Sequence, residues 1–385
     1  MRPQDFQPPS PEKYSVVNLD ELVADLPTDD RELFYRIFAM SVSRGRLRAP
    51  ASMQDWLVEQ FGSLDTVNEQ KVLRLVNLIT LEGSIFNSIR ASRPFHRHKP
   101  YEFEADIDSP SRSDPFCSPL TDTPEDVFGR VEGEHCITAS NVAKFEGHHA
   151  VIIFQRHNPL RFTLEEFTDY LETGLQWASK AHQADPSAKY YFCMWNCLWK
   201  AGATLAHGHM QAILGRDIHY AKIEGLRRAA LSYRSQYGVN YFDSLYQVHQ
   251  SLGCSFERHG VRIMASLTPI KEKEVILMCE SSDQSGFRWN RNLGLSLKER
   301  SYEVLSCLRD EMGVASFNLA LYTPPIAEVD EDWSGFPIQI RIVDRGWLTE
   351  APSDIGAMEL YSSSVVASDP FEVIRVLKRF CDTKG

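Results

Sequence analysis

Two histidines and a glutamine alternate along one short apolar stretch, and these are the residues best suited to chemistry. His207, His209 and Gln211 occur in the segment ATLAHGHMQAIL. Alternate side chains of a β-strand share one face, so this spacing predicts a row of two imidazoles and one carboxamide. Such a row is costly to bury without polar partners, which favours a polar pocket over a structural core.

The residues just before this row are suited to binding an anion. Ala201, Gly202, Ala203 and Thr204 form a small-residue turn in which a ligand can approach backbone N–H groups, and Thr204 adds a hydroxyl. A neutral imidazole is an available nucleophile near pH 7. An H-x-H pair alone also occurs in structural strands and in zinc sites. The flanking turn is therefore what favours a phosphate-binding, functional interpretation.

The segments around this row predict a compact unit of strands and one long helix. We expect strands over residues 135–140, 149–154, 189–195 and 207–214. A helix begins after Thr163, which has capping-box spacing to Glu166, and runs to about residue 182.

A similar order of elements recurs downstream, which indicates an internal duplication. Strands are predicted over residues 261–266, 274–278, 316–322 and 338–343, and a helix over 295–312. The place of the H-x-H pair is taken here by Gln339-Ile340-Arg341, so this half lacks the nucleophile. A helix over residues 370–380 closes the chain. Short turns between consecutive strands favour antiparallel pairing, and hence an α+β fold.

The N-terminal region is predicted to be helical. Ser52 and Asp55 resemble a capping box, and Val67 to Ile79 repeats apolar residues at helical spacing. The expected organisation is a helical extension over residues 1–85, a catalytic half over 86–255 and a second half over 256–385.

Composition limits the classes of partner. The net charge is −11, which argues against nucleic acid and anionic membranes as partners. No apolar run approaches the length of a membrane span or provides the core of a signal peptide. The eight scattered cysteines are typical of buried free thiols in a reducing compartment, so we expect a cytoplasmic protein.

The stretch AGATLAHGHMQ resembles the H-x-H-x-Q signature of the galactose-1-phosphate uridylyltransferase branch of the histidine triad superfamily. Within that branch it is most similar to the diadenosine polyphosphate (Ap4A) phosphorylases, or ATP adenylyltransferases. The same order of segments is followed by DPF at 114–116, EHCITASN at 134–141 and FEGHHAVIIF at 145–154. Phe317-Asn318 and Met358-Glu359-Leu360 resemble the second domain of the uridylyltransferases. The resemblance implies duplicated antiparallel sheets of the histidine triad type.

This resemblance implies double displacement through a nucleotidyl-histidine intermediate. His209 corresponds to the nucleophile, and Gln211 would hydrogen-bond the phosphate oxygens. A carboxamide cannot act as a general acid, which fits a phosphate leaving group. Residues matched to substrate-binding positions are Asn141, Asn196, Gly202, Thr204, Arg90, Arg93 and Lys99. The implied substrates are a nucleotide and a phosphate or sugar phosphate. Because members of this superfamily often dimerise, the resemblance also implies a second copy of the chain as a partner.

Zinc is not expected to be required. Many uridylyltransferases use a C-x-x-C pair, a downstream histidine and the first histidine of H-x-H. Here Cys117-Ser118-Pro119-Leu120 retains one cysteine, so Cys117, His157 and His207 make three donors, whereas structural zinc normally has four. Without a metal, His207 would orient its neighbours by hydrogen bonding.

Three other functions stay open at the level of sequence. A hexose-1-phosphate uridylyltransferase would differ in nucleobase and acceptor, and a non-catalytic nucleotide-binding protein would bind without forming an adduct. A metal-binding regulator is the third alternative. The complete set of His207, His209 and Gln211 argues against a decayed site.

Overall fold

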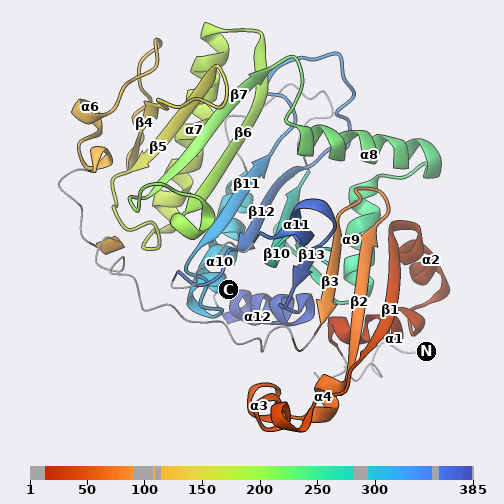
Figure 1. The fold of residues 1–385 in the computed structure, drawn as a ribbon. Coiled ribbons are helices and arrows are strands. Elements are labelled where there is room, and N and C mark those ends of the chain that lie inside the picture. The colour runs from red at the N-terminus through yellow and green to blue at the C-terminus, as the bar shows by residue number, and fades with distance from the viewer. Residues whose placement is uncertain are drawn as a thin grey trace.

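A nine-stranded sheet is the largest element of the fold (Figure 1). The computed structural model describes residues 14–87, 89, 107–108, 114–280, 294–348 and 355–383. The strand order is β4-β5-β7-β6-β11-β12-β10-β9-β8, and every neighbouring pair in this sheet is antiparallel. With helices packed on the sheet, the predicted α+β class is confirmed.

The sheet consists of two halves with the same strand order, which confirms the duplication. The first half contains β4 (Cys136–Ser140), β5 (His148–Phe154), β6 (Ala188–Cys197) and β7 (His209–Arg216). Their counterparts are β9 (Val261–Ala265), β10 (Glu272–Cys279), β11 (Phe317–Tyr322) and β12 (Ile338–Asp344). The halves join where β6 pairs with β11, and Asn196 lies opposite Asn318 at this junction. The extra strand β8 (Ser255–Arg258) extends the second half at its edge.

Helices cover one face of the sheet because alternate strand residues are apolar. Met210, Ala212 and Leu214 of β7 lie in the same buried cluster as apolar residues of three helices. These helices are α7 (Leu164–Ala184), α10 (Leu295–Asp310) and α12 (Pro370–Thr383). The capping box of Thr163 and Glu166 is formed, as predicted. Since Met210 faces the helices, His209 and Gln211 face the opposite side.

The N-terminal segment contains strands as well as helices, so the helical prediction for this region was wrong in part. Its strands are β1 (Phe38–Arg46), β2 (Glu69–Asn77) and β3 (Gly83–Asn87), and its helical elements are η1 (Val16–Asn18), α1 (Leu19–Ala24), α2 (Thr28–Ile37), α3 (Ala51–Phe61) and α4 (Leu64–Asn68). The apolar run from Val67 to Ile79 forms β2 instead of a helix, because β1 and β3 pair with it on both sides. Strand β13 (Ser364–Val366) extends this sheet in parallel with β3.

The predicted capping box at Ser52 is also absent. Helix α3 begins at Ala51, one residue before Ser52, and its N-cap residue is Pro50. Proline is favourable near a helix start because its φ is already helical, and here it sets the first turn in place of a side-chain cap.

The N-terminal sheet packs with α8 (Ala221–Tyr237) and α9 (Tyr241–Ser251) against the second half of the large sheet. Apolar residues of these elements share a buried cluster with Met264, Ile276 and Met278. The corresponding face of the first half carries a smaller cluster, in which Phe116 packs on Ala139, Val151 and Ile153. One half is thus covered by the N-terminal region, and the other presents His209 and Gln211.

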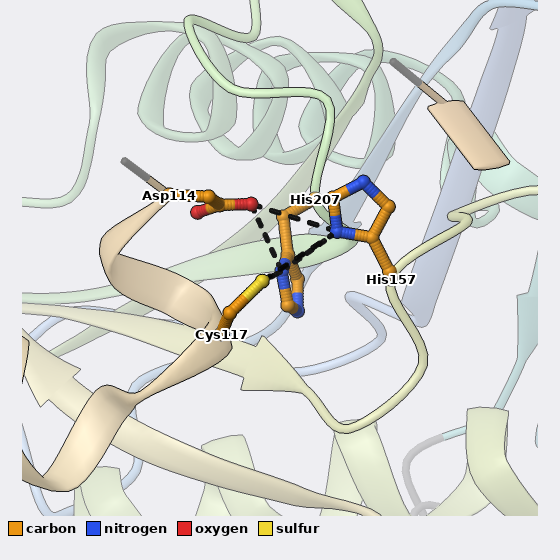
Figure 2. A group of neighbouring side chains, drawn as sticks. All are labelled: Asp114, Cys117, His157 and His207. Carbon is orange, nitrogen blue, oxygen red and sulfur yellow. Dashed lines mark hydrogen bonds and ion pairs between the residues drawn. The ribbon is translucent and has the colours of Figure 1, made fainter. Parts of the chain in front are cut away.

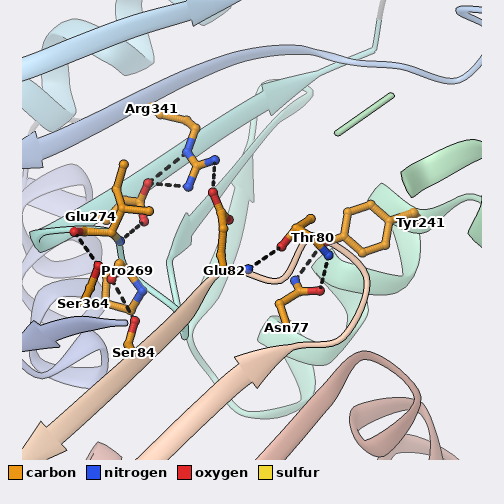
Figure 3. A network of polar contacts seen from close by, with 10 residues as sticks. Asn77, Thr80, Glu82, Ser84, Tyr241, Pro269, Glu274, Arg341 and Ser364 are labelled. Atoms are coloured by element: carbon orange, nitrogen blue, oxygen red, sulfur yellow. Dashed lines mark hydrogen bonds and ion pairs between the residues drawn. The ribbon is translucent and has the colours of Figure 1, made fainter. Parts of the chain in front are cut away.

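A polar network connects the N-terminal sheet to β12, the counterpart of β7 (Figure 3). The guanidinium of Arg341 donates to Glu274 Oε1 through Nε (2.9 Å) and Nη2 (2.6 Å), and through Nη1 to Glu82 Oε1 (2.9 Å). Ser84 donates to the carbonyl of Pro269 (2.7 Å), and Asn77 to the hydroxyl of Tyr241 (2.7 Å). On the second half, the same face of the sheet is therefore occupied by a buried ion-pair network.

Two further properties bear on the expectations from composition. Among the helices that the structure describes, none is long and apolar enough to cross a bilayer. All eight cysteines are free thiols, and Cys117 is the exposed member of the set.

Removing the cation of the network should destabilise the protein strongly. Arg341→Met leaves Glu274, which is 2% exposed, as a buried carboxylate without its partner. We expect the free energy of unfolding to fall by about 3–5 kcal/mol, measured by urea denaturation. Arg341→Met combined with Glu274→Gln should recover much of this loss, because the fully buried carboxylate is then removed and the remaining one, Glu82, is 20% exposed. A loss below about 1 kcal/mol in the single variant would contradict the importance of the pair.

A buried histidine should make stability depend on pH. His249 Nδ1 donates to the carbonyl of Leu245 (2.8 Å), its Nε2 accepts from the N–H of Leu267 (3.2 Å), and burial lowers its pKa to about 4. At pH values above the pKa of histidine in the unfolded chain, about 6.5, the neutral His249 ring contributes fully to the free energy of unfolding. This contribution is lost as pH falls toward 4, since only the unfolded chain then binds the proton.

The measurement is urea denaturation of His249→Gln and the natural protein at intervals from pH 7 to 4. The substitution should reduce the slope of unfolding free energy against pH by up to about 1.4 kcal/mol per pH unit. His259→Asn, on the exposed β8–β9 turn, controls for the loss of one histidine. Equal slopes in all three proteins would refute this assignment.

Candidate active site

His209 is the first residue of β7, and its ring orientation is fixed by the backbone two residues earlier. Nδ1 lies 2.8 Å from the carbonyl oxygen of His207. A carbonyl only accepts, so Nδ1 carries the proton and Nε2 of the neutral ring keeps its lone pair. Burial lowers the pKa of His209, which favours the neutral form. Phe116 packs edge-on against this ring, at 5.2 Å between centroids.

Gln211 and Asn196 lie on the same face of the sheet as His209. Gln211 pairs with Met194 across β6 and β7, and continuing this antiparallel register by two residues places Asn196 level with His209. Asn196 Oδ1 accepts from Asn318 Nδ2 (2.8 Å). The amide N–H groups of Asn196 are therefore the part of that side chain left to donate to a ligand.

The second half of the chain contributes to this site through two residues that sequence reasoning did not assign. Asn318 Nδ2 also donates to the carbonyl of Ala201 (2.9 Å), and Arg345 donates to Asn318 Oδ1. These contacts hold the orientation of Asn318, and through it that of Asn196. The sequence indicated only that Asn318 lies in a strand of the second half. Local sequence patterns do not show that this strand pairs with β6.

The predicted phosphate turn lies on the connection from β6 to β7. Gly202 follows η4 (Trp199–Ala201) with φ +98°, a left-handed conformation that glycine adopts without strain. Gly202 and Thr204 are both exposed. The turn is thus open to a ligand approaching the face that carries Asn196.

Asn141 follows β4 and is held by a local turn. Its Oδ1 accepts from the N–H of Ala143 (3.0 Å), and its Nδ2 lies 3.2 Å from Nε2 of His149. His149 in turn contacts Gln211. The structure therefore brings Asn141 next to the Gln211 end of the site. The predicted cations Arg90, Arg93 and Lys99 lie outside the described residues.

His207 lies in the turn before β7, whereas the sequence pattern predicted it within the strand. Its Nε2 donates to the carbonyl of Phe154 (2.8 Å). The edge of its ring that carries Nδ1 faces Asp114, Cys117 and His157 (Figure 2). Backbone pairing continues next to it, since the N–H of Phe154 donates to the carbonyl of Gly208 (3.0 Å).

These four residues place donor atoms suited to a metal ion around one point. His207 Nδ1 lies 3.2 Å from Asp114 Oδ2, 3.6 Å from Cys117 Sγ and 3.1 Å from His157 Nδ1. All four donor atoms lie within 4.8 Å of one another. Since His207 Nε2 is the protonated nitrogen, Nδ1 of the neutral ring presents a lone pair to a carboxylate, an unfavourable contact that a cation would relieve.

Asp114 is the donor that sequence reasoning missed. The sequence comparison with a C-x-x-C pair used positions 117 and 120, whereas the two donors that lie together are Asp114 and Cys117, which have the same spacing of three. Asp114 sits at the start of η3 (Pro115–Cys117), where its carboxylate also accepts from the N–H of Phe116 (2.9 Å). The signal in the sequence was the spacing of three between Asp114 and Cys117, because carboxylates also bind zinc.

Solved structures share this fold over most of the chain. An ADP-glucose phosphorylase from Arabidopsis thaliana with bound ADP-glucose matches with a TM-score of 0.60 at 16% identity, covering 79% of this chain and 97% of that one. A GalT-like protein from the same plant gives 0.57 at 16%, covering 78% and 96%. A uridylyltransferase gives 0.55 at 14%, covering 75% and 94%.

No protein-family model and no curated protein matches the sequence significantly. At these identities the structural matches establish architecture. They agree with the large antiparallel sheet and the helices packed on it. The chain therefore shares the fold of the ADP-glucose phosphorylase, the GalT-like protein and the uridylyltransferase.

Proposed function

We propose that the chain is a nucleotidyltransferase of the phosphorylase type that works by double displacement through a nucleotidyl-His209 intermediate. The observation that carries this proposal is the hydrogen bond from His209 Nδ1 to the carbonyl of His207 (2.8 Å). It leaves Nε2 as the nucleophilic nitrogen, on a face shared with Gln211 and Asn196. The substrate class is a dinucleoside polyphosphate or a nucleotide sugar.

In the first step Nε2 of His209 attacks the α-phosphorus. A P–N bond forms and the bond from phosphorus to the bridging oxygen breaks. The leaving group takes the electron pair: it is a nucleoside polyphosphate from a dinucleoside polyphosphate, or a sugar phosphate from a nucleotide sugar. The ring becomes a cation that keeps its Nδ1 proton. The carbonyl of His207, already hydrogen-bonded to that proton, stabilises the positive charge without reorganising.

In the second step an oxygen of phosphate or sugar phosphate attacks the same phosphorus. The P–N bond breaks and the neutral imidazole is restored. The amides of Gln211 and Asn196 donate to the phosphoryl oxygens as charge develops on them. A carboxamide supplies no proton to a leaving group, which suits a phosphate that departs as an anion.

We also propose that Asp114, Cys117, His157 and His207 hold a zinc ion. One thiolate, two imidazoles and one carboxylate are all donors that zinc accepts, and four of them make a closed structural set. The ion would supply positive charge between the lone pair of His207 Nδ1 and the carboxylate of Asp114, which otherwise face each other unfavourably. The residues themselves then fix His207, whose carbonyl orients His209.

The covalent intermediate can be trapped directly. Incubation with radiolabelled ADP-glucose, UDP-glucose, a GDP-sugar or diadenosine tetraphosphate, without acceptor, should label about one site per chain with a bond that is acid-labile and stable to alkali. His209→Ala should abolish both adduct and turnover. Gln211→Ala should slow turnover by roughly 10²–10³-fold with binding retained.

Two outcomes would contradict the proposed reaction. Full turnover by His209→Ala would exclude this histidine as the nucleophile. Binding of a nucleotide from the panel without adduct or turnover in the natural protein would identify a non-catalytic nucleotide-binding protein. The nucleobase of the substrate that labels His209 would separate a phosphorylase from a hexose-1-phosphate uridylyltransferase.

The metal proposal predicts zinc in the purified protein. Elemental analysis should find about one zinc per chain, and Cys117→Ala should lose most of it together with thermal stability. Cys279→Ala, a cysteine outside the cluster, is the matched control and should keep its zinc. Protein expressed with ample zinc but purified free of it would overturn the proposal.

A further inference from the structure

His149 is a fully buried histidine next to Gln211, and the reaction described above does not use it. It lies on β5, which pairs with β7 so that Val151 is opposite Gln211 and His149 opposite Ile213. Opposite residues of an antiparallel pair share a face, so His149 is a diagonal neighbour of Gln211 on the site's face. Its Nε2 lies 2.9 Å from Gln211 Oε1.

The protonation of this ring is determined by a backbone group. The N–H of Phe145 donates to Nδ1 (3.0 Å), and a backbone N–H has no alternative role. Nδ1 must therefore be unprotonated, and the neutral ring carries its proton on Nε2. Burial lowers the pKa of His149, which keeps the ring neutral.

This proton determines which way the amide of Gln211 points. With Nε2–H as donor, the group of Gln211 that faces His149 must be its oxygen. Reversing the amide would bring its N–H groups against Nε2–H and lose a buried hydrogen bond. Asn141 Nδ2, at 3.2 Å from the same nitrogen, is also a donor and makes a contact there, not a second hydrogen bond.

The loop from β4 to β5 holds the ring from the other side. The ring of Phe145 stacks on His149 at 4.8 Å between centroids, with 27° between the planes. Lys144 Nζ and the N–H of Asn141 both donate to the carbonyl of His149 (3.2 and 2.9 Å). The ring is therefore fixed in place as well as in tautomer.

We propose that His149 is a positioning residue for Gln211. Its Nε2–H holds the amide oxygen of Gln211, and the amide N–H groups are thereby turned toward the phosphoryl oxygens beside His209. This inference rests on the proposed function, because it concerns the donor that acts on the phosphoryl group. The residue acts through Gln211 and does not touch substrate.

Single-turnover kinetics of adduct formation test this role, with the nucleotide of the panel that labels His209. His149→Phe keeps a ring to stack on Phe145 but removes the donor, and it should slow adduct formation on the order of 10-fold with nucleotide binding unchanged. His149→Gln, whose amide can still donate to Oε1, should stay within about 3-fold of the natural protein. His148→Phe, on the opposite face of β5, is the matched control and should be within about 2-fold.

A double-mutant cycle separates positioning from a general structural effect. In the Gln211→Ala background, His149→Phe should change the rate by less than about 2-fold, because no amide remains to orient. An equal loss in both backgrounds would overturn the positioning role, as would full activity of His149→Phe. Absence of any adduct in the natural protein would instead refute the proposed function. If His149→Phe does not fold, His149→Gln is compared in the natural and the Gln211→Ala backgrounds instead. A loss of 10-fold or more in the rate of adduct formation that is equal in both backgrounds overturns the positioning role.

Discussion

The geometry of the candidate site depends on one hydrogen bond, from Nδ1 of His209 to the carbonyl of His207. In the proposed reaction it decides which ring nitrogen attacks phosphorus, and it places an oxygen dipole where positive charge develops. The bond is rigid because the acceptor residue is itself fixed: His207 Nε2 donates to Phe154 on the adjacent strand, and Nδ1 faces Asp114, Cys117 and His157. In the proposed reaction the donor cluster therefore acts indirectly, because it fixes the residue whose carbonyl orients His209.

The duplicated sheet explains why one half carries this site and the other does not. Both halves bury one face under helices, and they differ in what covers the other face. In the second half the N-terminal sheet brings Glu82 to Arg341, which also pairs with Glu274 on β10. The guanidinium of Arg341 is therefore taken up by two carboxylates of its own chain. The second half still serves the first, because Asn318 orients Asn196 across the β6–β11 junction.

The fold was predictable wherever a local sequence pattern fits only one type of secondary structure. The alternation of β7 and the capping box of α7 are local signals, and the structure forms both. The pattern from Val67 to Ile79 was ambiguous, since apolar residues at positions 72, 73, 75 and 76 fit a helix as well as a strand covered on both faces. Pairing with β1 and β3 made it a strand. His207 was also misplaced: it lies in the turn before β7, and its side chain bonds to the backbone of β5, which no local pattern records.

The sequence by itself determined the shared face of His209 and Gln211, the order of elements in the two halves and the small-residue turn before β7. These follow from the period of the strand and from residue types close together in the chain. Only the tertiary structure decided which distant residues complete the site. Asp114 is 93 positions from His207, His149 is 62 from Gln211, and Asn318 is 122 from Asn196. Such contacts arise from strand pairing and loop packing, and both the tautomers of the rings and the orientations of the amides follow from them.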